Sequence, residues 1–162
     1  MPFAERDTGR VPEPFVPAGF EPPEPPSHDD FVLEPLGPEH NERDHAAWMS
    51  SIDHIRSTPG FPVGGWPTAM SLDENLGDLE RHAADFTART GFTYTVLSPT
   101  DRDVIGCVYV YPSKEGGHDA SVRSWVRASH AELDVPLWHV VSDWIASGWP
   151  FDRVDYAPRS HA

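Results

Sequence analysis

At Gly91, near the middle of the chain, the hydrophobic pattern changes from a helical repeat to a strand repeat. Residues 71–74, Ser-Leu-Asp-Glu, form a capping box before this point, because the serine oxygen and the glutamate carboxylate each bond an amide left free at a helix start. The apolar stripe of the predicted helix consists of Leu72, Leu76, Leu79, Ala83 and Phe86. Gly91 is the predicted left-handed residue that ends this helix. A chain that carries both repeats folds by packing helices against a sheet.

Three predicted strands follow, each with a repeat of two residues. Residues 92–97 and 104–111 flank the turn 98–103 and predict an antiparallel hairpin. A loop, 112–119, leads to the third of these strands, 120–128. Alternate residues of a strand point to opposite faces of the sheet. One face of the third strand carries Val122, Ser124 and Val126, and the other carries Arg123, Trp125 and Arg127.

The remaining elements lie on both sides of this central part. The chain before it contains a short strand, 31–36, a helix that ends before 57–60, and a loop, 61–70. The apolar stripe of that helix consists of Trp48, Met49, Ile52 and Ile55. After the strands, a helix begins around Pro136, which suits a first helical turn, and ends at Gly148. A last short strand covers 153–157, so the order predicts an α+β fold with a mixed sheet.

The N-terminal segment has a different composition from the rest of the chain. Residues 1–30 contain eight of the 18 prolines, seven acidic residues and two arginines. Such a segment buries too little apolar surface to offset the entropy lost on ordering, so we expect a disordered or extended arm. Its apolar residues Phe3, Phe15, Val16 and Phe20 leave two alternatives, a mobile tail or an arm that docks on the domain or on a second subunit. The expected organisation is an arm over 1–30, a domain over 31–157 and a tail over 158–162.

The chain is strongly acidic, with 26 acidic and 12 basic side chains and a formal net charge of −14. Lys114 is the single lysine, so no lysine-rich stripe exists that could neutralise a run of phosphates. We therefore expect neither nucleic acid nor an anionic membrane surface as a partner.

Several further kinds of site and protein class are excluded because the sequence lacks their motifs. Cys107 is the single cysteine, which rules out an internal disulfide and a cysteine-paired zinc site. The nine histidines include no His-Glu-x-x-His motif, so no metal site is expected. Nucleotide-binding loops and a Gly-x-Ser-x-Gly elbow are also missing. The longest apolar run, 104–111, has strand length, and the N-terminus lacks a secretory signal, so we expect a cytoplasmic protein without a membrane span.

Two short stretches and the order of the elements have counterparts in a known family. Residues 103–108, Asp-Val-Ile-Gly-Cys-Val, look like a third strand that commonly reads x-x-Ile-Gly-x-x. Residues 121–126, Ser-Val-Arg-Ser-Trp-Val, look like a fourth strand that ends in valine. With two helices after the first strand and a helix before the last one, residues 31–157 resemble the front three-quarters of the GCN5-related N-acetyltransferase (GNAT) family.

The resemblance implies a GNAT-like mixed sheet and transfer of an acyl group from acyl-coenzyme A, such as acetyl-CoA, to a small amine. In the family, the backbone amide and carbonyl of the valine that corresponds to Val126 pair with the pantetheine arm of the coenzyme. The residues that the resemblance places beside the coenzyme are Ser124, Trp125, Val126, Arg127, His130 and Ala131.

The sequence departs from the family in two places. The family has an Arg or Gln and a glycine-rich loop soon after the strand-four valine, where helix amides hold the coenzyme phosphates. Here those positions are Ala131, Glu132, Asp134 and Pro136, and the two carboxylates would repel a phosphate. The family also continues with a helix and two further strands, whereas this sequence stops at Ala162. We therefore expect a domain without those elements. Either another subunit supplies the missing half, or the N-terminal arm covers the exposed edge, or the domain does not catalyse acyl transfer.

A few residues have side chains suited to chemistry. His130 is the candidate general base, with a phosphate-bonding or solvated-loop role as alternatives. The candidate acceptor pocket consists of Phe61, Trp66, Tyr109 and Tyr111, for which core packing is the alternative. Arg123 and Arg127 form either a packing ladder with Trp125 or an anion site.

These observations leave two functional hypotheses. The first is an N-acetyltransferase that acylates a small amine. The second is a non-catalytic relative that kept the fold as a ligand-binding or dimerisation module after losing the phosphate loop. Glu132, Asp134 and Pro136 favour the second hypothesis, whereas Ile105, Gly106 and Val126 fit both.

Overall fold

Five strands form one sheet in the computed structural model, which describes residues 14–61 and 65–159. The strands are β1 (Val32–Pro35), β2 (Phe92–Leu97), β3 (Val104–Tyr111), β4 (Ala120–Val126) and β5 (Val154–Tyr156). They lie side by side in chain order, and every neighbouring pair is antiparallel except β4 and β5, which are parallel. The predicted α+β class with a mixed sheet is confirmed.

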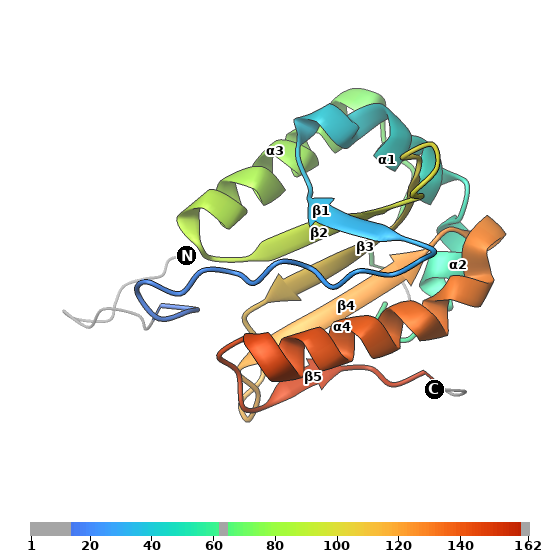
Figure 1. Ribbon diagram of the computed structural model, residues 1–162. Coiled ribbons are helices and arrows are strands. Elements are labelled where there is room, and N and C mark those ends of the chain that lie inside the picture. The colour runs from blue at the N-terminus through green and yellow to red at the C-terminus, as the bar shows by residue number, and fades with distance from the viewer. Residues whose placement is uncertain (1–13, 62–64, 160–162) are drawn as a thin grey trace.

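Helices cover both faces of the sheet (Figure 1). The helices α1 (Asn41–Met49), α2 (Ile52–Arg56) and α3 (Leu72–Ala88) lie on one face, and α4 (Asp134–Gly148) lies on the other. Two short 3-10 turns, η1 (Pro38–His40) and η2 (Ala128–Leu133), precede α1 and α4. Parallel strands need a crossover connection, and α4 provides it between β4 and β5.

Each face of the sheet has its own apolar core. Val122 and Val126 of β4 belong to the core beneath α4, together with Leu137 and Val141 of that helix. Trp125 faces the opposite way and belongs to the core beneath α1, whose largest buried residues include Trp48 and Ile55. The alternation predicted for β4 from its period of two is therefore observed.

The single helix predicted over Trp48 to Ile55 is wrong, because the chain breaks between α1 and α2. The Ser50 hydroxyl donates to the Ala47 carbonyl, and the buried Ser51 hydroxyl accepts the amide of Ala128. Serine side chains that bond nearby backbone compete with the regular helix. The second bond also joins this break to the loop after β4, which no local pattern predicts.

The capping box of α3 is confirmed, since Ser71 Oγ accepts from the Glu74 amide and the Glu74 carboxylate accepts from the Ser71 amide. The predicted stop at Gly91 is wrong. Arg89 takes the left-handed conformation, with φ of 67°, and its guanidinium donates to the Pro17 and Phe20 carbonyls. These bonds to the N-terminal arm offset the strain of a left-handed residue that has a Cβ.

The apolar stripe predicted for α3 needs one correction. Leu72 is 39% exposed at the start of the helix, whereas Asn75 is almost fully buried. The Asn75 side chain accepts from Trp48 Nε1 and donates to Asn41 and Asp44. Because the polar atoms of the Asn75 side chain are hydrogen-bonded, this residue is compatible with the apolar core, and its polarity alone does not predict exposure to solvent.

Residues 14–30 of the N-terminal arm form no helix or strand, turn at 18–19 and lie against the domain (Figure 1). Val16 is buried in the core beneath α4, and Phe15 stacks on Phe151 with ring centroids 5.0 Å apart. Phe20 packs on Trp149 at 5.5 Å. Phe3 and the rest of 1–13 lie outside the described residues, as do 160–162 of the proposed tail.

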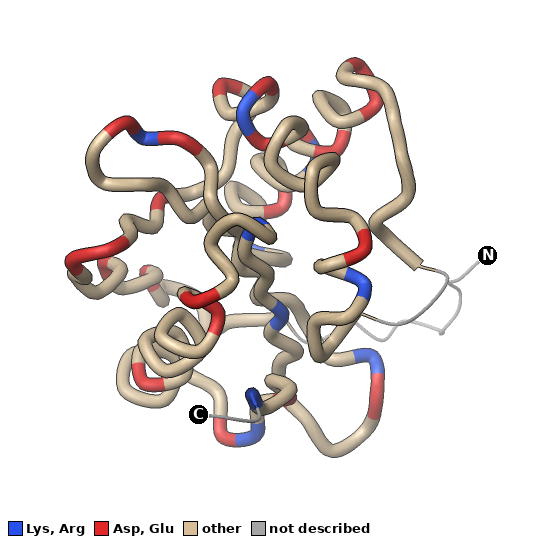
Figure 2. Tube along the Cα trace, turned by 90° about the vertical axis from the view of Figure 1, so that its right-hand side faces the viewer, with Lys and Arg blue, Asp and Glu red and all other residues tan. Residues whose placement is uncertain are grey.

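Acidic residues outnumber basic ones along the described chain (Figure 2). They are distributed over helices and loops instead of being gathered in one segment. Within 14–61 and 65–159, none of the helices combines the length and the apolar character that crossing a bilayer requires.

Candidate functional site

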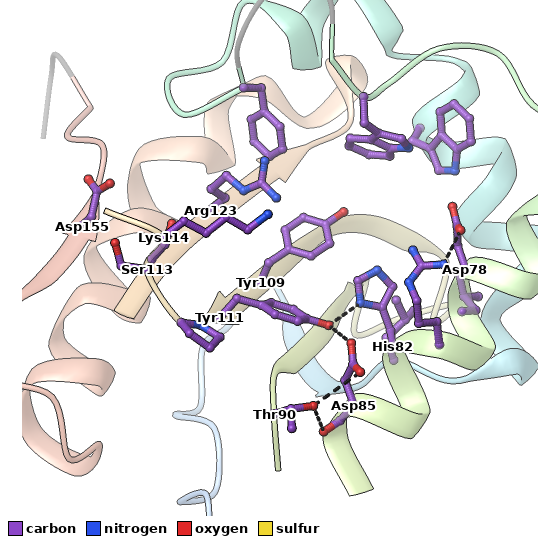
Figure 3. Close-up of a pocket in the computed structure, with 18 of the residues that line it drawn as sticks. Asp78, His82, Asp85, Thr90, Tyr109, Tyr111, Ser113, Lys114, Arg123 and Asp155 are labelled. Atoms are coloured by element: carbon purple, nitrogen blue, oxygen red, sulfur yellow. Dashed lines mark hydrogen bonds and ion pairs between the residues drawn. The ribbon is translucent and has the colours of Figure 1, made fainter. Parts of the chain in front are cut away.

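A cavity of about 960 Å³ lies between the sheet and the α1 to α3 layer. The four aromatic residues predicted to form an acceptor pocket, Phe61, Trp66, Tyr109 and Tyr111, all line it. Figure 3 shows that the tyrosine side chains rise from the strands toward α3, while aromatic rings stand opposite them. Their rings form a connected surface, since Tyr109 lies 6.4 Å from Trp66 and 6.5 Å from Phe61 between centroids.

A hydrogen-bonded cluster lies in the wall of this cavity where α3 meets β2 and β3. The Tyr111 hydroxyl donates to Asp85 Oδ2 at 2.8 Å. His82 Nδ1 lies 2.9 Å from the Tyr111 hydroxyl and 2.9 Å from Thr93 Oγ1. The Tyr109 ring lies 5.7 Å from the imidazole. His82 is therefore held in one orientation by contacts from two strands and from its own helix (Figure 3).

The bond to Tyr111 favours one neutral tautomer of His82. Because the Tyr111 hydroxyl gives its proton to Asp85, its oxygen can accept a proton from His82 Nδ1, whereas the Thr93 hydroxyl can either accept from Nδ1 or donate to it. Nε2 of the neutral ring then carries the lone pair and has no partner among the described residues. Burial lowers the pKa of His82, with Arg81 and Arg123 acting in the same direction and Asp85 and Asp78 in the opposite one. His82 is thus neutral at pH 7 and able to accept a proton from a bound ligand.

Two local features of the sequence create this cluster. His82 comes three residues after Leu79 and four before Phe86, so the helical repeat turns it to the sheet side of α3. Gly91 lies under the Tyr111 ring, and a Cβ there would overlap the ring carbons. Because Gly91 has no side chain, the Tyr111 ring can occupy this position. No sequence motif singled out His82 and Asp85, although their helical spacing from Leu79 indicates the same side of the helix.

A second polar group, Asp44, lies deeper in the wall of the cavity. Asp44 is 4% exposed, and Asn75 Nδ2 donates to its Oδ2 at 3.1 Å. Burial raises the pKa of Asp44 from 3.8 to about 6, although the bond from Asn75 acts in the opposite direction. An ionised Asp44 at pH 7 is therefore costly for the free protein, and a cation in the cavity would relieve that cost.

Replacing Asp44 with asparagine should stabilise the protein at pH 7. The folded state holds the Asp44 proton more tightly than the unfolded chain does, so the stability from this group is lost as pH rises from 3.8 through about 6. We expect Asp44→Asn to raise the free energy of unfolding by about 2 kcal/mol at pH 7 and by less than about 1 kcal/mol at pH 4. Urea denaturation at both pH values measures this, and an equal effect at both would contradict it.

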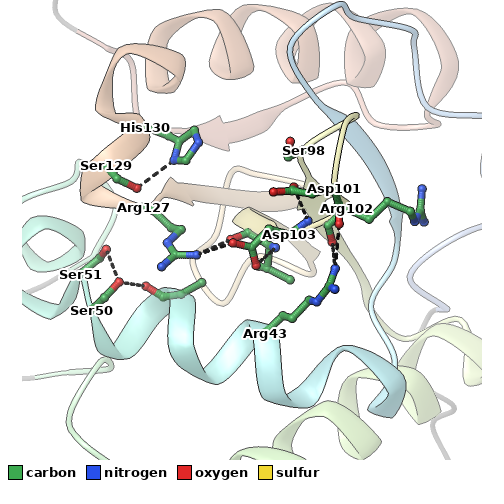
Figure 4. A network of polar contacts seen from close by, with 12 residues as sticks. Arg43, Ser50, Ser51, Ser98, Asp101, Arg102, Asp103, Arg127, Ser129 and His130 are labelled. Carbon is green, nitrogen blue, oxygen red and sulfur yellow. Dashed lines mark hydrogen bonds and ion pairs between the residues drawn. The ribbon is translucent and has the colours of Figure 1, made fainter.

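The residues predicted to hold the coenzyme are engaged in bonds within the chain (Figure 4). Arg127 donates to Asp103 Oδ2 at 3.2 Å and to the Val104 carbonyl. His130 Nδ1 lies 2.9 Å from Ser129 Oγ, and His130 is not among the residues that line the cavity. The geometry therefore does not support His130 as the general base for a ligand in that cavity.

The other predicted coenzyme residues lie in the core or at the surface. Trp125 is fully buried and its Nε1 donates to the Tyr109 hydroxyl at 2.9 Å, while Val126 is buried beneath α4. Ala131 is exposed in η2. Ser124 is buried, and its hydroxyl lies 2.6 Å from the Tyr156 hydroxyl of β5.

Arg159, which no sequence motif singles out, lies between β4 and the chain after β5. Its Nη2 donates to the Ser124 carbonyl at 2.9 Å, and its Nε donates to Asp134 Oδ2 at 2.8 Å. Its Nη1 bonds the Ala157 carbonyl at 2.8 Å. Arg159 is 5% exposed, so this guanidinium is a fully bonded part of the interior.

Arg159 lies at the strand edge where the resemblance would place a coenzyme. Ser124 and Val126 are two residues apart on β4, so their carbonyls point to the same strand edge, which is the edge that the family resemblance assigns to pantetheine. Arg159 already bonds that edge at Ser124. Asp134 is held as the partner of Arg159, and Pro136 has no amide to donate. In this position Arg159 therefore bonds, at Ser124, the strand edge that the resemblance assigns to the coenzyme.

Among the described residues, no group of three or more His, Cys, Asp or Glu side chains is placed to hold a metal ion. Cys107 is free and buried, and burial raises the pKa of its thiol well above the usual value.

Comparison with solved structures identifies the fold. The chain superposes on ribosomal-protein-S5-alanine acetyltransferase from Vibrio fischeri with a TM-score of 0.54 and 11% identity, covering 74% of this chain and 65% of that one. It superposes on RimL, a ribosomal L7/L12 α-N-protein acetyltransferase in complex with coenzyme A, with a TM-score of 0.56 and 12% identity, covering 76% and 68%. No protein-family model matches the sequence, and no curated protein is significantly similar to it.

Proposed function

Because the chain has the fold of the GCN5-related N-acetyltransferases, we propose that it is an N-acyltransferase that uses acyl-coenzyme A and acylates a small amine held in the cavity between the sheet and α3. The observation that supports the amine is the cavity wall, in which a neutral, oriented histidine stands beside aromatic rings and carboxylates. Fold alone does not assign an activity, so the proposal depends on this wall.

The residues of the cavity provide what an amine acceptor needs. Aromatic faces such as those of Trp66 and Tyr109 attract a cation, and carboxylates such as Asp85 complement its charge. An ammonium must lose a proton before it attacks, and His82 Nε2 is the group that accepts it. Asp85 and Tyr111 keep the imidazole in the required tautomer, as the third group of a catalytic triad does. A positioned base of this kind contributes about 10²- to 10⁴-fold in rate.

One observation favours a second candidate, a GNAT-fold module that binds a ligand without catalysis. The strand edge assigned to the coenzyme is bonded by Arg159, and Asp134 is its ion-pair partner. If this arrangement persists in solution, the amine cavity exists without an acyl donor. The two candidates share the cavity and differ in whether the chain binds the coenzyme.

Titration of the full chain with acetyl-coenzyme A by calorimetry separates the candidates. For an acyltransferase we expect saturable binding at millimolar ligand or below, followed by acylation of amines from a small-molecule panel. Absence of binding at millimolar ligand would refute the enzyme. Amine binding by that same sample would then leave the binding module as the function.

We expect His82→Gln to lower kcat/KM for the acylated amine about 100-fold or more, because glutamine bonds but does not take a proton. The affinity for the amine should change less than about threefold. His139, which is exposed on α4 and does not line the cavity, provides the matched control His139→Gln, with activity unchanged. Equal activity of His82→Gln and the wild type would rule out the proposed base.

A further inference from the structure

The charged groups of the cavity are divided between its two walls. The helical wall contributes the carboxylates Asp44, Asp78 and Asp85 together with Arg81, and the strand side contributes the cations Arg123 and Lys114 together with Asp155 and Glu115. A ligand with one ammonium group needs only the carboxylates of the helical wall. The two cations on the strand side would have no role in binding such a ligand.

Arg123 and Lys114 reach into the cavity from neighbouring parts of the sheet. Arg123 extends from β4, and its guanidinium lies 5.2 Å from the Phe61 ring centroid and 5.7 Å from that of Tyr109. Lys114 extends from the loop after β3. Figure 3 shows the two side chains converging toward the middle of the cavity above Tyr111.

Neither cation has an ion-pair partner among the described residues. Asp155 and Glu115 line the same rim, but no carboxylate of residues 14–61 or 65–159 lies within 4.0 Å of either charged group. Two converging cations without a partner repel each other and gain from an anion placed between them. In a chain with a net charge of −14 and a single lysine, this pairing of positive charges is distinctive.

The helical wall still carries negative charge when the ion pair and hydrogen bonds of its carboxylates are taken into account. Arg81 Nη1 bonds Asp78 at 2.9 Å and neutralises it. Asp85 accepts the Tyr111 hydroxyl, which leaves its charge in place. Asp44 is buried and carries one donor, from Asn75. Both walls line one cavity, since His82 and Asp85 contribute to the same lining as Arg123 and Lys114.

We infer that the cavity takes a zwitterion, with its ammonium group toward His82 and Asp85 and its anionic group between Arg123 and Lys114. The ligand class is a small amino acid or related amine that carries a carboxylate or phosphate. Its body packs on the rings of Tyr109 and Trp66. This inference rests on the proposed amine site and adds the anionic group to it.

Matched pairs of probes test the anionic group by calorimetry with the full chain. The pairs are phenylalanine with phenethylamine, 5-aminovalerate with pentylamine, and phosphoethanolamine with ethanolamine, so that spacing and anion type both vary. We expect the zwitterion of at least one pair to bind ten times or more tightly than its amine. The phosphate pair distinguishes a phosphate ligand from a carboxylate ligand.

Variants then locate the effect. Arg123→Gln and Lys114→Gln should each weaken the preferred zwitterion about tenfold and leave its matched amine unchanged within twofold. Arg153→Gln, which removes an exposed positive charge that does not line the cavity, should change neither. Because both cations are exposed, neither variant is expected to unfold the domain.

The outcomes separate this inference from the proposed function. If the amines bind and no zwitterion is preferred, the anionic site is refuted and the amine site stands. If a preference exists but survives both variants, the assignment to Arg123 and Lys114 is refuted. If neither amines nor zwitterions bind, the amine site and the inference that rests on it both fail.

Discussion

Replacing Arg159 with alanine is expected to destabilise the protein by about 3 kcal/mol at pH 7. Its guanidinium, 5% exposed, bonds the Ser124 carbonyl and the Asp134 carboxylate, so it joins β4 to the start of α4. Removing one partner of a largely buried ion pair leaves the other charge without compensation, and the carbonyl loses its donor. The pair also shields Asp134 from repulsion by other acidic groups in a chain of net charge −14.

Urea denaturation of the full chain measures the change, and Arg153→Ala is the matched control because Arg153 is exposed. The double variant with Asp134→Asn tests the pair itself: its effect should be smaller than the sum of the two single effects by about 1 kcal/mol or more. A loss below about 1 kcal/mol for Arg159→Ala would show that the pair contributes little. Acetyl-coenzyme A binding that appears only after Arg159→Ala would show that this side chain occupies the coenzyme position.

The second large effect is expected at Gly106, the glycine of the Ile-Gly stretch in β3. A Cβ placed there would lie 2.5 Å from the Trp125 carbonyl oxygen and 3.4 Å from Val126 Cα. These are backbone atoms of the strand that pairs with Gly106, so they cannot move aside without breaking the β3 to β4 ladder. We expect Gly106→Ala to cost about 3 kcal/mol or to prevent folding.

Gly77 provides the control for this substitution. It lies inside α3, is exposed, and has open space where a Cβ would be. Gly77→Ala should therefore raise the free energy of unfolding by about 0.5 to 1 kcal/mol, the gain in helix propensity. Thermal unfolding of both variants measures the contrast. A stable Gly106→Ala variant would contradict the close approach of β3 and β4 at this residue.

The strands and the order of the elements were predictable because they depend on local pattern. A period of two over 92–97 and 104–111 corresponds to β2 and β3, and the capping box at Ser71 marks the start of α3. The break between α1 and α2 was not predictable, because Ser51 bonds the amide of Ala128 far along the chain. The left-handed Arg89 was missed for the same reason, since its compensation comes from the N-terminal arm.

The residues of the candidate site were also predictable only in part. Four aromatic residues were predicted from the sequence to form an acceptor pocket, and the structure brings them to one cavity. Their role in binding stays a prediction. His130 was chosen for its place after β4, yet it lies outside the lining of that cavity, and His82 on α3 is the histidine that faces it. The position of a histidine in the sequence therefore does not show whether its side chain reaches the cavity.

The amino-acid sequence by itself determined the class of fold, the alternation of β4 and the acidity of the chain, because periodicity and composition are properties of neighbouring residues. Only the tertiary structure decided which charges meet. It placed Arg159 on Ser124 and Asp134 and gathered His82, Asp85 and Tyr111. It also left Arg123 and Lys114 facing the cavity with no carboxylate of the described residues within 4.0 Å of either charged group. The physical reason is that such contacts join residues from different elements, and their energies depend on burial and distance, which no local pattern contains.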